Sequence, residues 1–200
     1  TTAIKMLCGL TRPTGGDAIL DGKSILQEKK KKKKIIAISP QETAVAPGLT
    51  VWENLMLMAG VSGFSREAQQ EKTEKMVAQF GFESVISKKA GKLSGGWQRR
   101  LSIAMALICE PEILFLDEPT LGLDVIARSE LWDLIRSLKG KMTIVLTTHY
   151  MEEAEALSDR IGIMKSGKLL ICDTLDGIKA AAGADDLESA FIHLVKGDAE

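Results

Sequence analysis

The most constraining feature of the sequence is a short apolar run at 113–116 that ends in two adjacent carboxylates, Asp117 and Glu118. A continuously apolar run of this length after Pro111 is typical of a strand buried on both faces of a parallel sheet. Open α/β sheets place their ligands at the carboxyl ends of such strands. The sequence therefore predicts an α/β fold with a site beside these two carboxylates.

The two carboxylates suit different tasks. Asp117 can hold Mg²⁺ directly or through water, because magnesium in phosphate sites takes one or two carboxylates and keeps several waters. Glu118 would point elsewhere and can polarise the water that attacks a terminal phosphorus. The alternative is that Asp117, Glu118 and Pro119 form only a polar strand exit. The motifs on either side of the strand favour the chemical interpretation.

A glycine-rich turn, Ser94-Gly95-Gly96, lies upstream of this strand. Ser94 is expected to cap a helix with its hydroxyl, and the glycines leave the backbone amides open to an anion at the helix N-terminus. Apolar residues at helical spacing give this helix a buried face: Leu101, Ala104, Met105 and Ile108. Such tripeptides more often form a loop and a cap, but Gln98-Arg99-Arg100 and the carboxylate strand favour a phosphate cradle.

Several motifs in one order resemble the ATP-binding cassette (ABC) ATPases. Leu93–Gly96 resembles their signature motif, and Leu114–Glu118 resembles their Walker B strand. Thr120–Asp124 resembles their D-loop, His149 resembles their switch histidine, and Ser39–Glu42 resembles their Q-loop. The resemblance covers essentially the whole chain.

A narrower resemblance, carried by Glu152–Glu155 and Leu187–Phe191, is to the ATPases that drive ABC-2-type exporters. Trp97 departs from the family, which usually has glutamine after Ser-Gly-Gly. This departure puts contacts to the ribose or phosphate in doubt and leaves the anion cradle intact.

The family places a Gly-rich loop and its lysine immediately before threonines like Thr1 and Thr2. Thr1 thus resembles the hydroxyl ligand of Mg²⁺, and Thr2 its neighbour near the α-phosphate. We expect a chain truncated within the Walker A motif, which binds ATP poorly in isolation because it lacks the lysine and the amide cradle. The alternative is that the two threonines are only a frayed start.

The resemblance implies roles for further residues. Gln41 would reach Mg²⁺ or the attacking water and sense the membrane subunit, and His149 would donate a hydrogen bond to the γ-phosphate. Asp124 would cross a dimer interface, or cap the helix at 125–138, or both. Two copies would sandwich two ATP molecules. In each site one copy supplies Ser94, Gly95 and Gly96, and the other supplies Thr1, Gln41, Asp117, Glu118 and His149.

The implied function is that of an ATP-hydrolysing motor subunit with ATP and Mg²⁺ as cofactors. Its partners would be a second nucleotide-binding domain, as a homodimer, and a separate membrane permease. The protein would be cytoplasmic and peripheral on the inner face of the cell membrane, where it binds the permease. The alternatives are a soluble ABC-type ATPase acting on ribosomes or DNA and a catalytically incompetent fragment. A net charge of −1 and a pI near 6.2 provide no basic field for nucleic acid.

The predicted architecture is one nucleotide-binding domain over 1–200, a P-loop NTPase (RecA-like) core without its N-terminal strand and Gly-rich loop. A helical subdomain is expected at 47–93, on a mostly parallel sheet. We expect helices at 2–10, 50–81, 125–138 and 151–157, and strands at 16–21, 35–38, 112–116, 142–148, 160–164 and 168–172.

Three features stand outside these motifs. Lys29–Lys34 is six consecutive lysines, either a solvated loop or a contact with anionic lipid headgroups. Three cysteines with no paired spacing, Cys8, Cys109 and Cys172, fit a reducing compartment. Trp52 or Trp97 is expected to face the membrane partner, although buried packing is the default for tryptophan.

Overall fold

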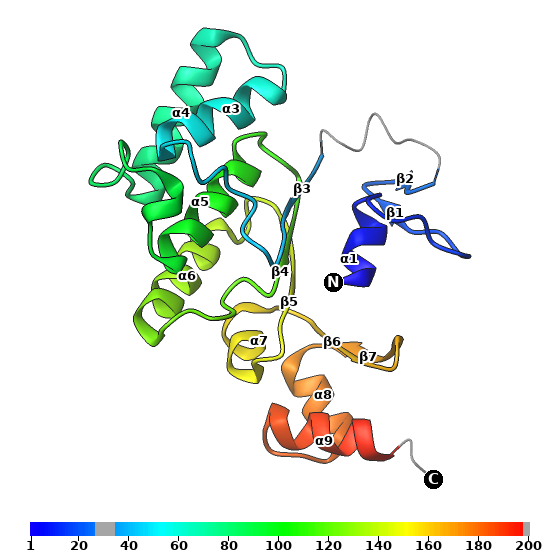
Figure 1. Ribbon diagram of the computed structural model, residues 1–200. Coiled ribbons are helices and arrows are strands. Elements are labelled where there is room, and N and C mark those ends of the chain that lie inside the picture. The colour runs from blue at the N-terminus through cyan, green and yellow to red at the C-terminus, as the bar shows by residue number, and fades with distance from the viewer. Residues whose placement is uncertain (27–34, 198–200) are drawn as a thin grey trace. The chain divides into compact units, whose positions relative to one another are not determined.

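The computed structural model describes residues 1–26 and 35–197, and the chain divides into two compact units, Thr1–Thr147 and Thr148–Glu200. The first unit contains a parallel sheet of three strands, β3 (Ile36–Ser39), β4 (Ile113–Asp117) and β5 (Thr143–Thr147), with β4 in the centre (Figure 1). The predicted parallel α/β arrangement is confirmed for this unit. None of the helices in the described residues is long and apolar enough to span a bilayer.

Every residue of β4 is buried, as the apolar run predicted. Ile113 and Phe115 share one face of the strand and cluster with Ile4 of α1 (Thr2–Leu7). Helices α5 (Gly95–Leu107) and α6 (Val125–Leu138) lie on one side of the sheet (Figure 1). The apolar face expected for α5 is confirmed, since its four predicted members are all buried: Leu101, Ala104, Met105 and Ile108.

A helical segment lies between β3 and α5 in the chain. It contains α3 (Val51–Val61), α4 (Arg66–Phe80) and a 3₁₀ turn at Ala90–Lys92, η1. The expected helical region at 50–81 therefore forms two helices, with the break at Ser62–Ser65. Thr50 and Glu53 form a reciprocal capping box at the start of α3. These helices occupy the part of the chain in which the helical subdomain was expected.

Two tight hairpins differ from the predicted strands. The expected strand at 16–21 is instead the pair β1 (Ile19–Leu20) and β2 (Lys23–Ser24), turned by Asp21-Gly22. The strands expected at 160–164 and 168–172 are present as β6 (Ile161–Lys165) and β7 (Lys168–Asp173), but the two pair antiparallel and are not part of a parallel alternation. Both turns are two residues with positive φ, which suits a type I′ hairpin and leaves no room for a crossover.

The second unit surrounds β6 and β7 with α7 (Met151–Leu157), α8 (Leu175–Ala182) and α9 (Leu187–Gly197). Its core joins Ile161 and Ile163 of β6 to Ile178 of α8 and Leu187 and Ala190 of α9. The sequence predicted α7 with its observed bounds but did not predict α8.

The first helix is shorter than the sequence predicted. The helix expected at 2–10 ends at Leu7, where Cys8 is its C-cap and Gly9 follows with positive φ. Burial raises the pKa of the Cys8 thiol to about 11.

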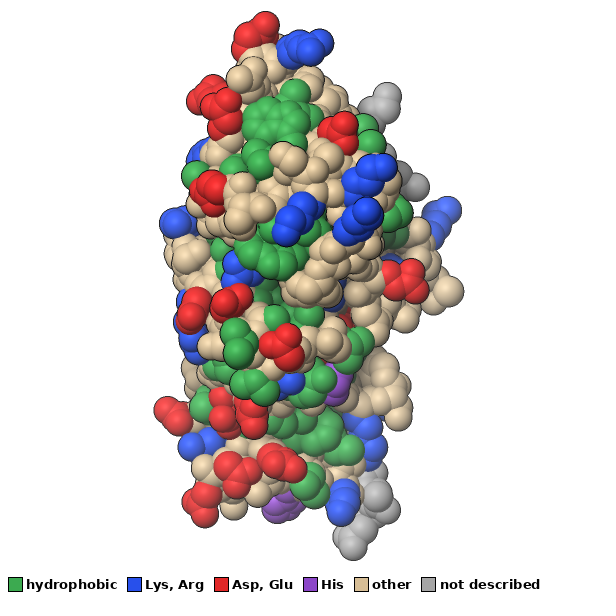
Figure 2. Space-filling view, turned by 60° about the vertical axis from the view of Figure 1, so that its left-hand side comes forward, with side chains coloured by type: hydrophobic (Ala, Val, Ile, Leu, Met, Phe, Trp, Pro, Cys, Tyr) green, Lys and Arg blue, Asp and Glu red, His purple; other side chains and the backbone are tan. Residues whose placement is uncertain are grey.

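The lysine run Lys29–Lys34 lies outside the described residues. On the face seen in Figure 2, acidic and basic side chains are interspersed rather than gathered into a field of one sign.

Asn54 provides a stability test of the helical segment. It is fully buried, its Oδ1 accepts from the Ala46 amide at 2.8 Å, and its Nδ2 donates to the carbonyls of Ala46 and Thr50. Asn54→Ala removes the acceptor of the part-buried Ala46 amide and leaves a cavity at a fully buried side chain, so we expect the free energy of unfolding to fall by about 2–3 kcal/mol in urea denaturation. Gln70→Ala, on the exposed face of α4, is the control and should change it by less than about 0.5 kcal/mol. Equal losses would contradict this role.

Candidate functional site

Asp117 ends the central strand with a buried carboxylate, 2 % exposed. Its Oδ1 accepts a hydrogen bond from Thr147 Oγ1 at 2.7 Å and from Thr1 Oγ1 at 3.2 Å, and the amino group of Thr1 lies 3.4 Å away. Thr147 ends β5 and is the register partner of Asp117, so the parallel sheet itself places the hydroxyl beside the carboxylate. The site is thus fixed by the ends of two neighbouring strands.

The surroundings of Asp117 favour its ionised form. Burial acts to raise the pKa of this carboxyl, but hydrogen bonds from Thr147 and Thr1 outweigh it, and the pKa lies below its usual value. A carboxylate that is ionised at neutral pH and has a hydroxyl 3.2 Å away provides the hard oxygen donors that Mg²⁺ takes. Within the described ranges no cluster of three or more His, Cys, Asp or Glu side chains forms an all-protein metal cage. The donor set therefore fits a magnesium ion that shares its ligands with phosphate and water.

Glu118 leaves the strand in the left-handed conformation, with φ 50°. Its amide donates to Thr147 O at 3.0 Å, which continues the ladder to β5 for one more residue. The change in direction after Asp117 comes from this turn rather than from the alternation of an extended strand. A left-handed non-glycine residue is uncommon and marks a position at which the surrounding structure imposes the backbone.

The turn before α5 has the predicted helix start but not the predicted cap. Ser94 is the N-cap residue, yet its side chain makes no capping hydrogen bond. Because Ser94 is exposed, water can satisfy its hydroxyl and the first amides of the helix equally well. The predicted capping hydrogen bond is therefore wrong. The Ser94 hydroxyl does not accept from the amides of the first turn of α5.

The two glycines of this turn have different surroundings. A Cβ at Gly96 would come within 3.0 Å of the Ala127 Cβ, so Gly96 permits the close approach of α5 and α6. A Cβ at Gly95 would meet nothing nearer than Leu123 Cδ2 at 3.9 Å. The fold therefore explains the glycine at 96 by packing but gives no packing reason for the glycine at 95.

Asp124 caps α6, as one of the two predictions for it required. Its Oδ1 accepts from the Ala127 amide at 2.9 Å. The next two residues, Val125 and Ile126, are 77 % and 72 % exposed, and Leu121 is also exposed. An apolar patch thus borders the cap.

Three other predicted residues have no described hydrogen bond to Asp117. Thr2 and Gln41 are exposed, and Gln41 directly follows Pro40 after the end of β3. His149 is exposed in the second unit, where its ring lies 4.1 Å from that of Tyr150. The roles expected of these three residues stay predictions.

Trp97 is partly buried and packs within its own unit. Its ring centroid is 5.9 Å from that of Phe82, and the Arg100 guanidinium lies 5.1 Å from the ring. The residue that departs from the family pattern therefore joins α5 to the helical segment.

Two residues of the site were missed by sequence reasoning. Thr147 holds Asp117, and its only signal was a polar residue at the end of an apolar strand. Arg99 is buried and donates hydrogen bonds to the backbone carbonyls of Pro40, Asp117, Glu118 and Pro119. The pair Arg99-Arg100 gave no sign of which arginine is buried.

Comparison with known proteins now assigns the family. The sequence model of the ABC transporter family matches residues 1–121. The chain belongs to the ABC transporter family. The probable multidrug ABC transporter ATP-binding protein YbhF of Escherichia coli is 39% identical to this chain over 201 residues. That match covers 98% of this chain and 35% of YbhF, so the chain spans about a third of this relative's length.

Solved structures of ATP-binding cassettes share the fold. An ATP-binding subunit of an ABC transporter superposes with a TM-score of 0.83 at 28% identity, covering 96% of this chain and 82% of that one. The dimeric, post-hydrolysis ATP-binding cassette MJ0796, bound to ADP and Pi, gives a TM-score of 0.76 at 26% identity, covering 87% and 79%. The predicted P-loop NTPase fold is confirmed.

The charge on Asp117 gives this cassette a pH-dependent stability. The pKa of Asp117 in the folded chain is lower than its unfolded value of about 3.9. The ionised carboxylate therefore contributes its full stabilisation at pH values above about 3.9. This contribution is lost as the pH falls through the folded pKa. Asp117→Asn keeps an acceptor oxygen for Thr147 but loses the charge, and should lower the free energy of unfolding by about 1–2 kcal/mol at pH 7.

Urea denaturation between pH 3 and pH 7 measures this difference. It should shrink as the pH falls below about 4. Asp133→Asn, which removes only an exposed ion pair with Arg136, should cost less than about 0.5 kcal/mol at pH 7. A difference between wild type and Asp117→Asn that stays constant down to pH 3 would contradict the assignment.

Proposed function

We propose that this chain is the ATP-binding and hydrolysing motor of an exporter, and that it drives a separate permease by ATP-dependent dimerisation. The observation that carries the proposal is the end of β4. There a buried, ionised Asp117 is held by the hydroxyls of Thr147 and Thr1, and Glu118 follows in a constrained turn. A metal-binding carboxylate next to a second, half-exposed carboxylate is the arrangement that nucleotide hydrolysis needs.

In the proposed reaction, Asp117, the Thr1 hydroxyl and the Gln41 side chain would hold Mg²⁺. The ion neutralises charge on the β- and γ-phosphates when it is bound. Glu118 accepts a proton from the attacking water, whose oxygen bonds to the γ-phosphorus. The bond to the bridging oxygen then breaks, and ADP and inorganic phosphate leave. His149 donates a hydrogen bond to the γ-phosphate, and Thr2 lies near the α-phosphate.

The second half of the site comes from a partner copy in this proposal. The amides that follow Ser94 are not engaged by its hydroxyl, and Gly95 has no packing reason to lack a side chain, so both are suited to an incoming phosphate. The exposed apolar patch beside Asp124 supplies surface for the contact. The dimeric state of MJ0796 with ADP and Pi supports the same assembly.

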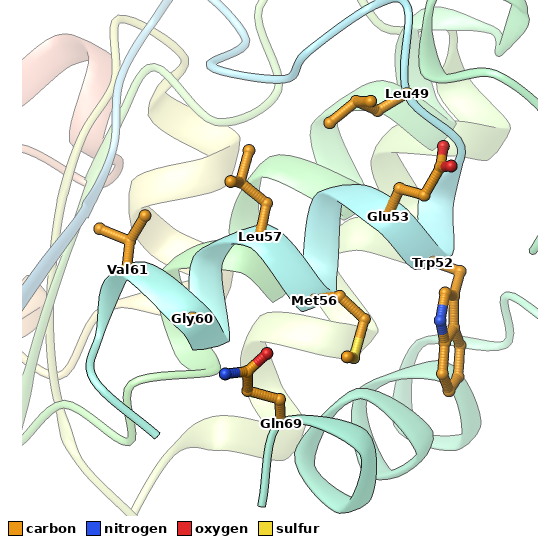
Figure 3. Close-up of a pocket in the computed structure, with 8 residues that line it drawn as sticks. All are labelled: Leu49, Trp52, Glu53, Met56, Leu57, Gly60, Val61 and Gln69. Carbon is orange, nitrogen blue, oxygen red and sulfur yellow. The ribbon is translucent and has the colours of Figure 1, made fainter. Parts of the chain in front are cut away.

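A pocket on the helical segment supports the permease partner. Trp52, Met56, Leu57 and Val61 line an open, mainly apolar hollow of about 700 Å³ along α3 (Figure 3). Leu57 and Val61 are exposed there. Trp97 packs against Phe82, so Trp52 is the better candidate for a membrane partner. The protein would then be cytoplasmic and peripheral on the inner face of the membrane, and the description of YbhF as a multidrug transporter supports export.

ATPase assays test the hydrolytic part. We expect a chain that carries a family-like strand and Gly-rich loop ahead of Thr1 to hydrolyse ATP. Glu118→Gln in the extended chain keeps the shape but removes the base, and should lower kcat by at least about 100-fold.

The same variant tests dimerisation. With ATP and Mg²⁺, size-exclusion chromatography of extended Glu118→Gln should show a stable dimer, and the extended wild type should return to monomer as ATP is consumed. Glu130→Gln, which removes a surface ion pair with Arg100, is the control and should keep wild-type turnover. A monomeric Glu118→Gln variant at saturating ATP would refute the dimerisation mechanism.

Coupling to the permease is tested at Trp52. In the transporter reconstituted in vesicles, Trp52→Ala should reduce transport while basal ATPase activity stays within about twofold, because the side chain contacts the partner and not the nucleotide. Trp132→Ala, on α6, is the matched tryptophan control. Unchanged transport by Trp52→Ala would count against the pocket as the docking surface.

A further inference from the structure

The guanidinium of Arg99 joins the ends of two strands. Arg99 lies on α5 and is 4 % exposed. Its Nε donates to Pro119 O at 2.8 Å, its Nη2 donates to Glu118 O at 2.6 Å and Asp117 O at 3.1 Å, and its Nη1 donates to Pro40 O. One planar group therefore binds three consecutive carbonyls, beginning at the last residue of β4, and one carbonyl just after β3.

These carbonyls lie at the points where the two strands end. Glu118 turns into the left-handed region, and Pro40 precedes the exposed Gln41. Buried carbonyls that leave a sheet need other donors, because an unsatisfied buried polar group costs about 1–3 kcal/mol. The five donors of a guanidinium lie in a fixed plane, so the group meets this need and also fixes the carbonyls relative to one another.

A second contact joins α5 to the end of β3 without reaching β4. Ser102 lies three residues after Arg99, on the same face of the helix, and its hydroxyl pairs with that of buried Ser39 at 3.0 Å. The Ser39–Ser102 pair and Arg99 therefore share the task of holding β3 on α5. Only Arg99 extends this connection to Glu118.

We propose that Arg99 is a positioning residue that sets the backbone of Glu118 according to the position of the segment at Pro40 and Gln41. The inference rests on the proposed ATPase function and adds a connection within it. A displacement of Pro40 moves an acceptor of the rigid guanidinium, which then keeps its other hydrogen bonds only if the carbonyls of Asp117, Glu118 and Pro119 move as well. The connection runs from backbone to backbone and does not need the side chain of Gln41.

Lysine cannot replace arginine in this role. Its ammonium is a single point with three donors, whereas the carbonyls of Pro40 and Pro119 are bound by different nitrogens of the guanidinium. Arg99→Lys retains the charge and a long side chain and loses the bridge. The double variant Ser39→Ala/Ser102→Ala is the matched control, since it removes both partners of a buried hydrogen bond between the same two elements.

Hydrogen–deuterium exchange on the 200-residue chain tests the connection without nucleotide. The amides of Glu118 and Leu121, which donate to Thr147 O and Glu118 O, should exchange at least about tenfold faster in Arg99→Lys and Arg99→Gln. The same amides should keep their rate within about twofold in the serine control. Unchanged exchange in both arginine variants, or a global loss of the fold in both, would overturn the proposal.

Steady-state kinetics on the chain extended ahead of Thr1 then separates positioning from simple stabilisation. We expect Arg99→Lys to lower kcat at least tenfold with KM for ATP within about threefold, well below its Tm, and the serine control to retain kcat within about twofold. Normal kcat in Arg99→Lys would overturn the proposal even if the amides exchange faster. An inactive extended wild type would instead refute the proposed function, and the exchange experiment would still decide whether Arg99 joins the two segments.

Discussion

The hydrogen bond from Thr147 to Asp117 is the contact on which the rest of the site depends. A buried carboxylate at the centre of a sheet needs donors, since its ionised form is strongly disfavoured away from water. The parallel register of β4 and β5 brings the Thr147 hydroxyl to 2.7 Å from Asp117 Oδ1 without any loop. The paired central strands of the first unit thus hold the charge that the proposed chemistry uses.

The sequence predicted the elements whose cause is local. The strand at β4 follows from an apolar run, α6 and α7 from apolar periodicity, and the cap at Asp124 from the residue type. The strands of the second hairpin were predicted, but their antiparallel pairing was not, although Ser166-Gly167 is a typical hairpin turn, because the expected α/β alternation favoured parallel strands. At Asp21-Gly22 the same expectation favoured one strand over a hairpin.

The site was predicted in part for a different reason. Asp117, Glu118 and the Ser94–Gly96 turn are contiguous motifs, so their residue types and order were enough to locate them. Arg99 contacts carbonyls 18 to 20 residues ahead and another 59 residues behind, and no periodicity shows which backbone groups will lack donors. Its role became visible only once the ends of β3 and β4 were placed. The absent Ser94 cap has a similar origin, because solvent exposure decides whether a hydroxyl is needed.

The left-handed backbone of Glu118 has a consequence for how this protein can change. A non-glycine residue in that region is disfavoured by about 1–2 kcal/mol, so glycine or asparagine at this position would relieve local conformational frustration. Directed evolution for heat resistance alone would thus tend to replace the carboxylate that the proposed chemistry requires. Any thermostable descendant that keeps Glu118 must draw its added stability from elsewhere in the fold.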